Sequence, residues 1–116
     1  MSAADNLRRA KALIEPKEGW CVLTMFRDQR GNIVHKPEHA ASYCSLGALT
    51  ACNIPWVNAH VSMKNESLIG KEERALLDAC ERRGFDFIPS MNDSSEHAGV
   101  LEVFDLAICI AECNDE

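Results

Sequence analysis

The sequence predicts a helix-dominated α+β fold, with about four helices around one core and a β-hairpin packed on one side. Four stretches place apolar residues at the spacing of one helix face. One short stretch is rich in β-forming residues and runs into turn residues. Apolar residues make up 47% of the 116-residue chain, the fraction of an ordinary globular protein. This length fits a single domain over residues 1–116, large enough to bury a core without disulfides.

The first two predicted elements are a helix over residues 2–15 and a β-hairpin over residues 20–35. In the helix, the apolar side chains that share one face are Leu7, Ala10, Leu13 and Ile14. Pro16 then ends the helix. The longer arm of the hairpin begins at Trp20, and residues 28–32 supply the turn.

A third element, a helix over residues 38–52, carries an unusual run of small residues. Ala40, Cys44, Gly47 and Ala51 fall in one stripe along it. Small side chains let another backbone come close. We therefore expect this helix to be central, with the stripe as the tightest packing seam of the core.

Residues 53–70 are predicted to form an irregular excursion, because Asn, Pro and Gly interrupt any longer element there. A helix is predicted over residues 71–83. Gly84 fits the position just beyond its C-terminus.

The last predicted helix covers residues 94–113. Residues 89–95 before it read as a turn. We expect Asp93 or Ser94 to cap the helix, with Glu96 placed for a capping box.

The charge and hydropathy of the chain argue against two classes of partner. The net charge is −6, from 18 acidic and 12 basic residues. Proteins that bind nucleic acid normally show a basic surplus, so we expect no nucleic-acid partner. No apolar run approaches the length needed to cross a bilayer, so we expect no membrane partner.

The six cysteines predict reduced thiols in a cytoplasmic protein. Most of them lie in apolar helical stretches, and the first 15 residues are polar, without the apolar segment of a signal peptide. No C-x-x-C occurs. Cys109 and Cys113, like His35 and His39, are one helical turn apart, but neither pair has a matching second pair. We therefore expect no metal site and no cofactor.

Cys44 is the candidate nucleophile. A thiol near a helix N-terminus can have a lowered pKa, and His97, Asn92 or Asp93 could complete a catalytic arrangement. Against this, Cys44 is expected about two turns into its helix, where the field of the helix terminus has faded. Asn92 and Asp93 also fit a turn and helix cap. A small-ligand pocket beside them is a further alternative.

The candidate interaction residues lie in the 53–70 excursion. They combine an aromatic residue with apolar and polar neighbours, and they are Trp56, Val57, His60 and Met63. An exposed apolar stretch there could bind another protein. It could also pair two copies of the chain as a homodimer.

Four short motifs together resemble an uncharacterised family of small actinobacterial and phage proteins, over about residues 6–112. They are Gly19-Trp20, Asp28-x-x-Gly31, Tyr43-Cys44-Ser45-Leu46-Gly47-Ala48-Leu49, and Asn92-Asp93 before the last helix. The family pattern is GW, D-x-x-G, W-C-x-x-G-A-L and W-N-D.

The chain departs from the pattern at three places. Tyr43 and Met91 replace tryptophans, and His97-Ala98 stand where an Arg-Thr pair is usual. The resemblance implies the fold and a bacterial or phage-infected host cell, and it implies no reaction.

The leading functional hypothesis is a small acidic protein, encoded by a phage or mobile element, that binds and modulates a host protein. A cysteine-dependent enzyme using Cys44 and a small-ligand-binding domain remain the alternatives.

Overall fold

The computed structural model describes residues 2–52, 54 and 70–114. Its elements, in chain order, are α1 (Ala3–Ile14), a 3₁₀ turn η1 (Lys17–Gly19), β1 (Phe26–Arg27), a 3₁₀ turn η2 (Pro37–His39), β2 (Ser42–Tyr43), α2 (Ser45–Ala51), α4 (Lys71–Arg82), α5 (Ile88–Ser94) and α6 (His97–Cys113). Helices predominate, and β1 pairs with β2 in a small antiparallel sheet. The predicted helix-dominated α+β class is confirmed.

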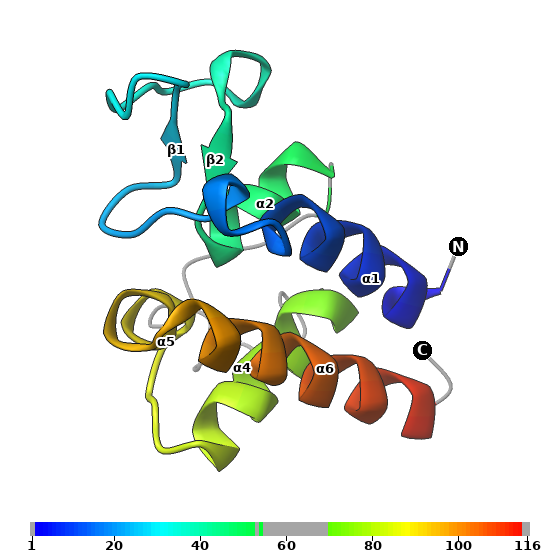
Figure 1. Cartoon of the computed structure of the whole chain (residues 1–116). Coiled ribbons are helices and arrows are strands. Elements are labelled where there is room, and N and C mark those ends of the chain that lie inside the picture. The colour runs from blue at the N-terminus through cyan, green and yellow to red at the C-terminus, as the bar shows by residue number, and fades with distance from the viewer. Residues whose placement is uncertain (1, 53, 55–69, 115–116) are drawn as a thin grey trace.

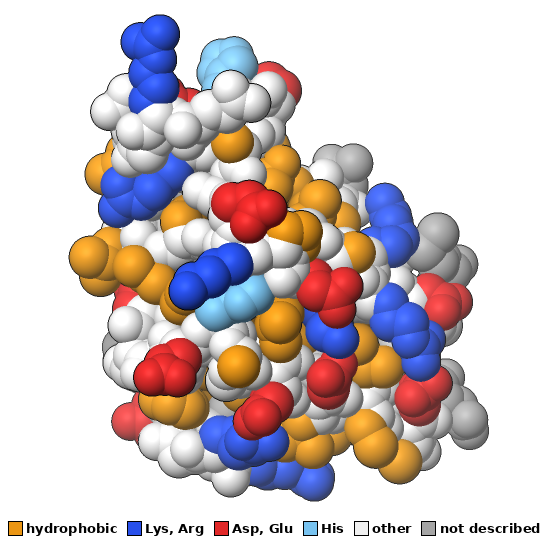
Figure 2. Space-filling view, viewed as in Figure 1, with side chains coloured by type: hydrophobic (Ala, Val, Ile, Leu, Met, Phe, Trp, Pro, Cys, Tyr) orange, Lys and Arg blue, Asp and Glu red, His pale blue; other side chains and the backbone are white. Residues whose placement is uncertain are grey.

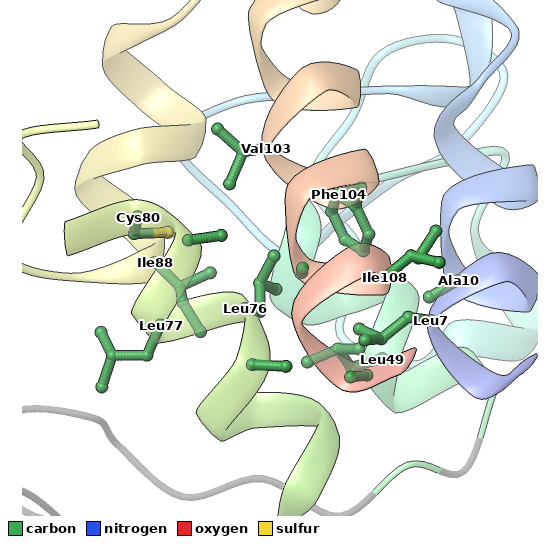
Figure 3. Packing of buried hydrophobic residues seen from close by; sticks show 14 of the residues in the cluster. Leu7, Ala10, Leu49, Leu76, Leu77, Cys80, Ile88, Val103, Phe104 and Ile108 are labelled. Atoms are coloured by element: carbon green, nitrogen blue, oxygen red, sulfur yellow. The ribbon is translucent and has the colours of Figure 1, made fainter. Parts of the chain in front are cut away.

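The core lies around α6. Figure 1 shows α1 and α6 running antiparallel, with the sheet and its loops projecting at one end of the molecule. In Figure 3, Phe104 and Ile108 of α6 lie beside Leu7 and Ala10 of α1, and Leu76 of α4 lies on the other side. These side chains belong to one buried apolar cluster. The central helix is thus α6, and the helix that was expected to be central, over 38–52, forms a shorter element at its edge.

The prediction of a helix over residues 38–52 is wrong at its N-terminal half, since α2 begins only at Ser45. Pro37 starts a separate 3₁₀ turn. The Ala41 N–H then donates to the Arg27 carbonyl at 2.7 Å, and the Cys44 N–H donates to the Met25 carbonyl at 3.0 Å. Because these backbone groups bond to the segment of β1, they cannot form helical bonds to the preceding turn.

The hairpin prediction is right at its turn and wrong in its longer arm. Asp28 Oδ1 accepts hydrogen bonds from the backbone N–H groups of Arg30 and Asn32, and Gly31 has a φ of 83°. Arg27 bridges Ile33 across this turn. The arm from residue 20 is broken at Leu23, whose φ of 68° turns the chain. The regular partner of β1 is β2, which the sequence did not reveal.

The helices of the C-terminal half divide differently from the prediction. The predicted turn over 89–95 is the helix α5, because Pro89 in the first helical turn needs no N–H partner. The last helix begins at His97 rather than at 94, and its cap residue is Glu96. Asp93 and Ser94 are therefore not its caps. The helices over 2–15 and 71–83 are confirmed as α1 and α4 within one or two residues.

Candidate functional site

Asn92 lies at the centre of a buried hydrogen-bond network. Its side chain is on α5 and is 1% exposed. Its Oδ1 accepts from Trp20 Nε1 at 3.0 Å, from the Ser45 backbone N–H at 3.0 Å and from the Ser45 hydroxyl at 2.8 Å. Its Nδ2 donates to the Cys21 carbonyl at 3.0 Å and to Asp93 Oδ1 at 3.1 Å. Every polar atom of this amide is thus bonded within the protein, and we call these five residues the Asn92 hub.

The hub joins three parts of the chain that are distant in sequence. Trp20 and Cys21 follow α1, Ser45 is the first residue of α2, and Asn92 belongs to α5. Buried polar groups are stable only when they are hydrogen-bonded, so a fully bonded amide fixes one arrangement of its partners. The hub therefore fixes the position of residues 20–21, which lead into the sheet, relative to α2 and α5.

Asp93 extends the hub to the surface. Its Oδ1 accepts a hydrogen bond from the Leu23 backbone N–H at 2.9 Å. Leu23 has a left-handed φ of 68° and is 75% exposed. A non-glycine residue in this conformation costs about 1–2 kcal/mol. The hydrogen bond to the Asp93 carboxylate therefore holds the Leu23 backbone in a conformation that leucine rarely adopts.

Cys44 is the residue that caps the N-terminus of α2. The expectation that it lies about two turns inside a helix is therefore wrong. Its Sγ accepts from the Gly47 backbone N–H at 3.4 Å, and the residue is 9% exposed. Burial raises the pKa of the thiol from 9.0 to about 11, although the N–H groups of Gly47 and Leu46 act in the opposite direction. The thiol is therefore protonated near neutral pH, which opposes nucleophilic attack because the thiolate is the reactive form.

Gly47 explains the C-x-x-G spacing of the motif. A Cβ built on it would lie 2.2 Å from the Met25 carbonyl oxygen, the same oxygen that accepts the Cys44 N–H bond. Only a residue without a side chain fits at this distance. The expected close approach is therefore present at Gly47, and its partner is the backbone next to β1.

His97 joins α6 to the end of α1. Its Nε2 lies 2.7 Å from the Ile14 carbonyl oxygen, and its ring centroid lies 5.4 Å from that of Trp20. His97 therefore connects the N-terminus of α6 to the C-terminus of α1 and packs beside Trp20. Beside it, an open depression of about 580 Å³ is lined by Lys17, Trp20, Glu96, His97 and Ala98. Trp20 is the hub residue that lines this hollow.

Trp56, Val57, His60 and Met63 lie outside the described residues. Within residues 2–52, 54 and 70–114, no group of three or more His, Cys, Asp or Glu side chains could hold a metal ion. In the same part of the chain, no helix combines the length and apolar character needed to cross a bilayer.

Sequence reasoning missed Ser45 and the role of Trp20 in the hub. One signal was available. A buried indole N–H needs an acceptor, and Asn92 could have been considered for it. The two residues are 72 positions apart in the chain, so no local pattern connects them.

Comparison with known proteins gives one family. The model of a family of unknown function (DUF6197) matches residues 1–109. No match was found among curated proteins or among solved structures. Since the family model covers nearly the whole chain, this protein belongs to the DUF6197 family of unknown function.

Proposed function

We propose that this chain is a non-enzymatic interaction protein that binds and modulates a protein of its host cell. The observation that carries this proposal is the closed bonding of the Asn92 hub. The amide has hydrogen bonds to Trp20, Cys21, Ser45 and Asp93, so it is not available to a substrate. The most distinctive motif residues thus hold the fold, and the function is assigned to the surface that they support.

The cysteine-dependent alternative receives less support from the geometry. A catalytic thiol needs a lowered pKa and a base within hydrogen-bond reach. Burial raises the pKa of Cys44 instead. The Nε2 atom of His97, the proposed base, lies against the Ile14 carbonyl.

We further propose that the protein works in the cytoplasm of a bacterial or phage-infected cell and originates from a phage or mobile element. All six cysteines are free thiols, which fits a reducing compartment. The acidic composition fits a soluble protein that meets a basic or mixed partner surface. Self-association as a homodimer would be a second mode of interaction.

The test is capture of a bacterial partner, followed by reconstitution from purified components. We expect saturable binding with a Kd of about 1 μM or tighter, corresponding to about −8 kcal/mol. The Cys44→Ser variant, which keeps an acceptor at the α2 cap, should bind equally. If it folds normally but loses its effect on the partner, Cys44 takes part in chemistry and the proposal is wrong. Absence of any saturable partner would also contradict it.

A further inference from the structure

The two exposed thiols of the chain lie together near the C-terminal end of α6. Three of the six cysteines are buried and a fourth is half-buried, whereas Cys109 and Cys113 are exposed. Both belong to α6 and are one helical turn apart, so their side chains leave the same face of the helix. We call Cys109 and Cys113 the thiol pair.

The thiol pair lines a depression between α4 and α6. The depression has a volume of about 400 Å³, and the residues that share its lining with the two thiols are Asp78, Arg82, Leu106, Ile110 and Asn114. Ile110 is 8% exposed and Leu106 packs against the buried cluster, so the part of the lining nearest the core is apolar. Figure 2 shows that hydrophobic side chains, a colour class that includes Cys, reach the surface over α6 between charged ones. A ligand held by both sulfurs is therefore partly shielded from water.

The spacing of the thiol pair suits an ion that bridges the two sulfurs better than it suits a disulfide. Cβ atoms four residues apart on a helix are about 5–6 Å apart, whereas a disulfide needs about 3.5–4.5 Å. A bond between the two sulfurs would therefore require the last turn of α6 to deform. An ion bonded to both sulfurs at about 2.3 Å, the length of a zinc–thiolate bond, holds them up to about 4.6 Å apart. Rotation of the two side chains brings their sulfurs to this distance without moving the helix.

The number of ligands selects the class of ion. In the part of the chain that the structure describes, no third His, Cys, Asp or Glu completes a metal-binding group with the thiol pair. Zinc sites use three or four protein ligands, so zinc does not fit. Thiolates are soft ligands that select Cu(I), and Cu(I) accepts two sulfurs in a line. The expectation of no metal site depended on the lack of a matching second pair, which a two-coordinate ion does not need.

The charged side chains in the lining compensate each other. Arg82 Nε lies 3.2 Å from Asp78 Oδ1, so the guanidinium and the carboxylate form an ion pair without excess charge. The C-terminal end of α6 carries the partial negative charge of a helix terminus, which attracts an incoming cation. Selectivity for the ion therefore comes from the two sulfurs and not from a charged surface.

We propose that the thiol pair binds one Cu(I) ion as a two-coordinate bis-thiolate. Two thiols and one Cu(I) give a complex with one negative charge, and the two thiol protons pass to the buffer. No electron is transferred, because the copper enters and remains as Cu(I). The site goes beyond the proposed function and does not depend on it.

The test titrates the full, reduced chain with Cu(I) in the absence of oxygen, in competition with the chromogenic Cu(I) chelator bicinchoninate. We expect each chain to remove one Cu(I) from the chelator, with a new thiolate-to-copper absorption in the ultraviolet and an unchanged sedimentation coefficient. The bound ion should also protect Cys109 and Cys113 from iodoacetamide.

Serine substitutions identify the ligands. Cys109→Ser and Cys113→Ser each remove one of two sulfurs, so the apparent affinity for Cu(I) should fall more than about 100-fold, the upper range for loss of an outer-shell partner. Both positions are exposed, so the melting temperature should stay close to that of the wild type. Cys52→Ser, at the half-buried thiol, is the matched control and should keep the wild-type affinity.

Three results would overturn the copper site. Equal Cu(I) affinity of the wild type and Cys113→Ser would show that the thiol pair is not the ligand set. A sedimenting mass that doubles on Cu(I) addition would show that the ion bridges two chains. Rapid formation of a Cys109–Cys113 disulfide with oxidised glutathione, found by peptide mass spectrometry, would contradict the spacing on which the site depends.

Discussion

Asn92 shows how a single residue can be distinctive in sequence for a structural reason. Its amide is buried and bonded to an indole, a hydroxyl and two parts of the backbone. Asparagine is the residue that offers both an acceptor oxygen and two N–H donors at this length. The neighbouring Asp93 carries the same network to the surface at Leu23.

Truncating Asn92 should destabilise the protein strongly. Asn92→Ala leaves the Trp20 indole, the Ser45 N–H and the Cys21 carbonyl without their partner in a buried region. Each such loss costs about 1–3 kcal/mol, so we expect a total of at least about 3 kcal/mol. Urea denaturation measures this value. Asn114→Ala, at the exposed end of α6, is the control and should change stability by less than about 0.5 kcal/mol.

Buried and exposed thiols should react with an alkylating reagent at different rates. Cys44 and Cys80 are buried, and burial raises their pKa values to about 11 and about 12. Cys109 and Cys113 are exposed on α6. With iodoacetamide at neutral pH, mass spectrometry should find the exposed pair modified first. Cys44 and Cys80 should react only after denaturation. Fast modification of Cys44 in the folded protein would instead support the enzyme alternative.

At the scale of elements, α2 and the segment before β1 are held at an unusually short distance. Gly47 allows the approach, Cys44 caps the helix, and the Met25 carbonyl contacts both. The Cys44-x-x-Gly47 motif therefore packs the N-terminus of α2 against the segment that leads into β1. At Gly47 this packing leaves no room for a side chain.

Two glycine substitutions test this packing. Gly47→Ala places a methyl group 2.2 Å from a backbone oxygen, so we expect a loss of about 3 kcal/mol or more. Gly99→Ala, in the first turn of α6, meets only ordinary contact, with the nearest atom at 3.5 Å. It should be neutral or stabilise by up to about 1 kcal/mol. Calorimetric melting of both variants measures these changes in stability. Similar losses for the two would mean that Gly47 is not at a close contact.

The sequence predicted the long elements well because their information is local. The apolar faces of α1, α4 and α6 repeat along the chain at helical spacing. Prediction from the sequence failed where hydrogen bonds to distant segments determine the local structure. Residues 41–44 have helix-compatible side chains, but their backbone groups bond to residues 25–27. Leu23 breaks a β-rich run because Asp93, 70 positions away, holds its N–H.

The candidate site shows the same division. Cys44, Asn92 and His97 could be picked from the sequence as unusual residues. Their roles could not, because each role depends on a partner from another element: Met25, Trp20 and Ile14. The buried environment of Cys44, which sets the direction of its pKa, is likewise a property of the folded chain.

At the scale of the whole molecule, the helices share one buried apolar cluster, and the segment of residues 20–43 projects from them (Figure 1). Ion pairs between Arg8 and Glu112 and between Lys11 and Asp105 tie α1 to α6 on the outside. Such exposed pairs contribute little, so the buried cluster around α6 supplies most of the stability. The hub connects the projecting segment to these helices through hydrogen bonds to Trp20, Cys21 and Leu23.

The buried thiols should make the whole protein less stable at alkaline pH. The ordinary pKa of a thiol here is 9.0, and the folded values are about 11 for Cys44 and about 12 for Cys80. Above pH 9 the unfolded chain loses these protons while the folded chain keeps them, so stability falls as pH rises. Each thiol contributes about 1 kcal/mol per pH unit in that window.

Denaturation between pH 8.5 and 11 measures this dependence. Cys44→Ser should reduce the slope of unfolding free energy against pH, because serine does not titrate there. Cys109→Ser, at an exposed position, is the control and should keep the wild-type slope. Identical slopes for all three proteins would show that Cys44 is not buried as a neutral thiol.

Asn92 joins Trp20 to the helices in one closed hydrogen-bond network. Hydrogen exchange of the Trp20 indole N–H, followed by NMR, tests this network most directly. The chain has two tryptophans, so Trp56→Phe leaves one indole signal to assign. We predict that this proton exchanges as slowly as the backbone amides of α6, and that Asn92→Ala removes its protection. Exchange within minutes, while the Phe104 amide remains protected, would show that the Trp20 indole is not held in this network.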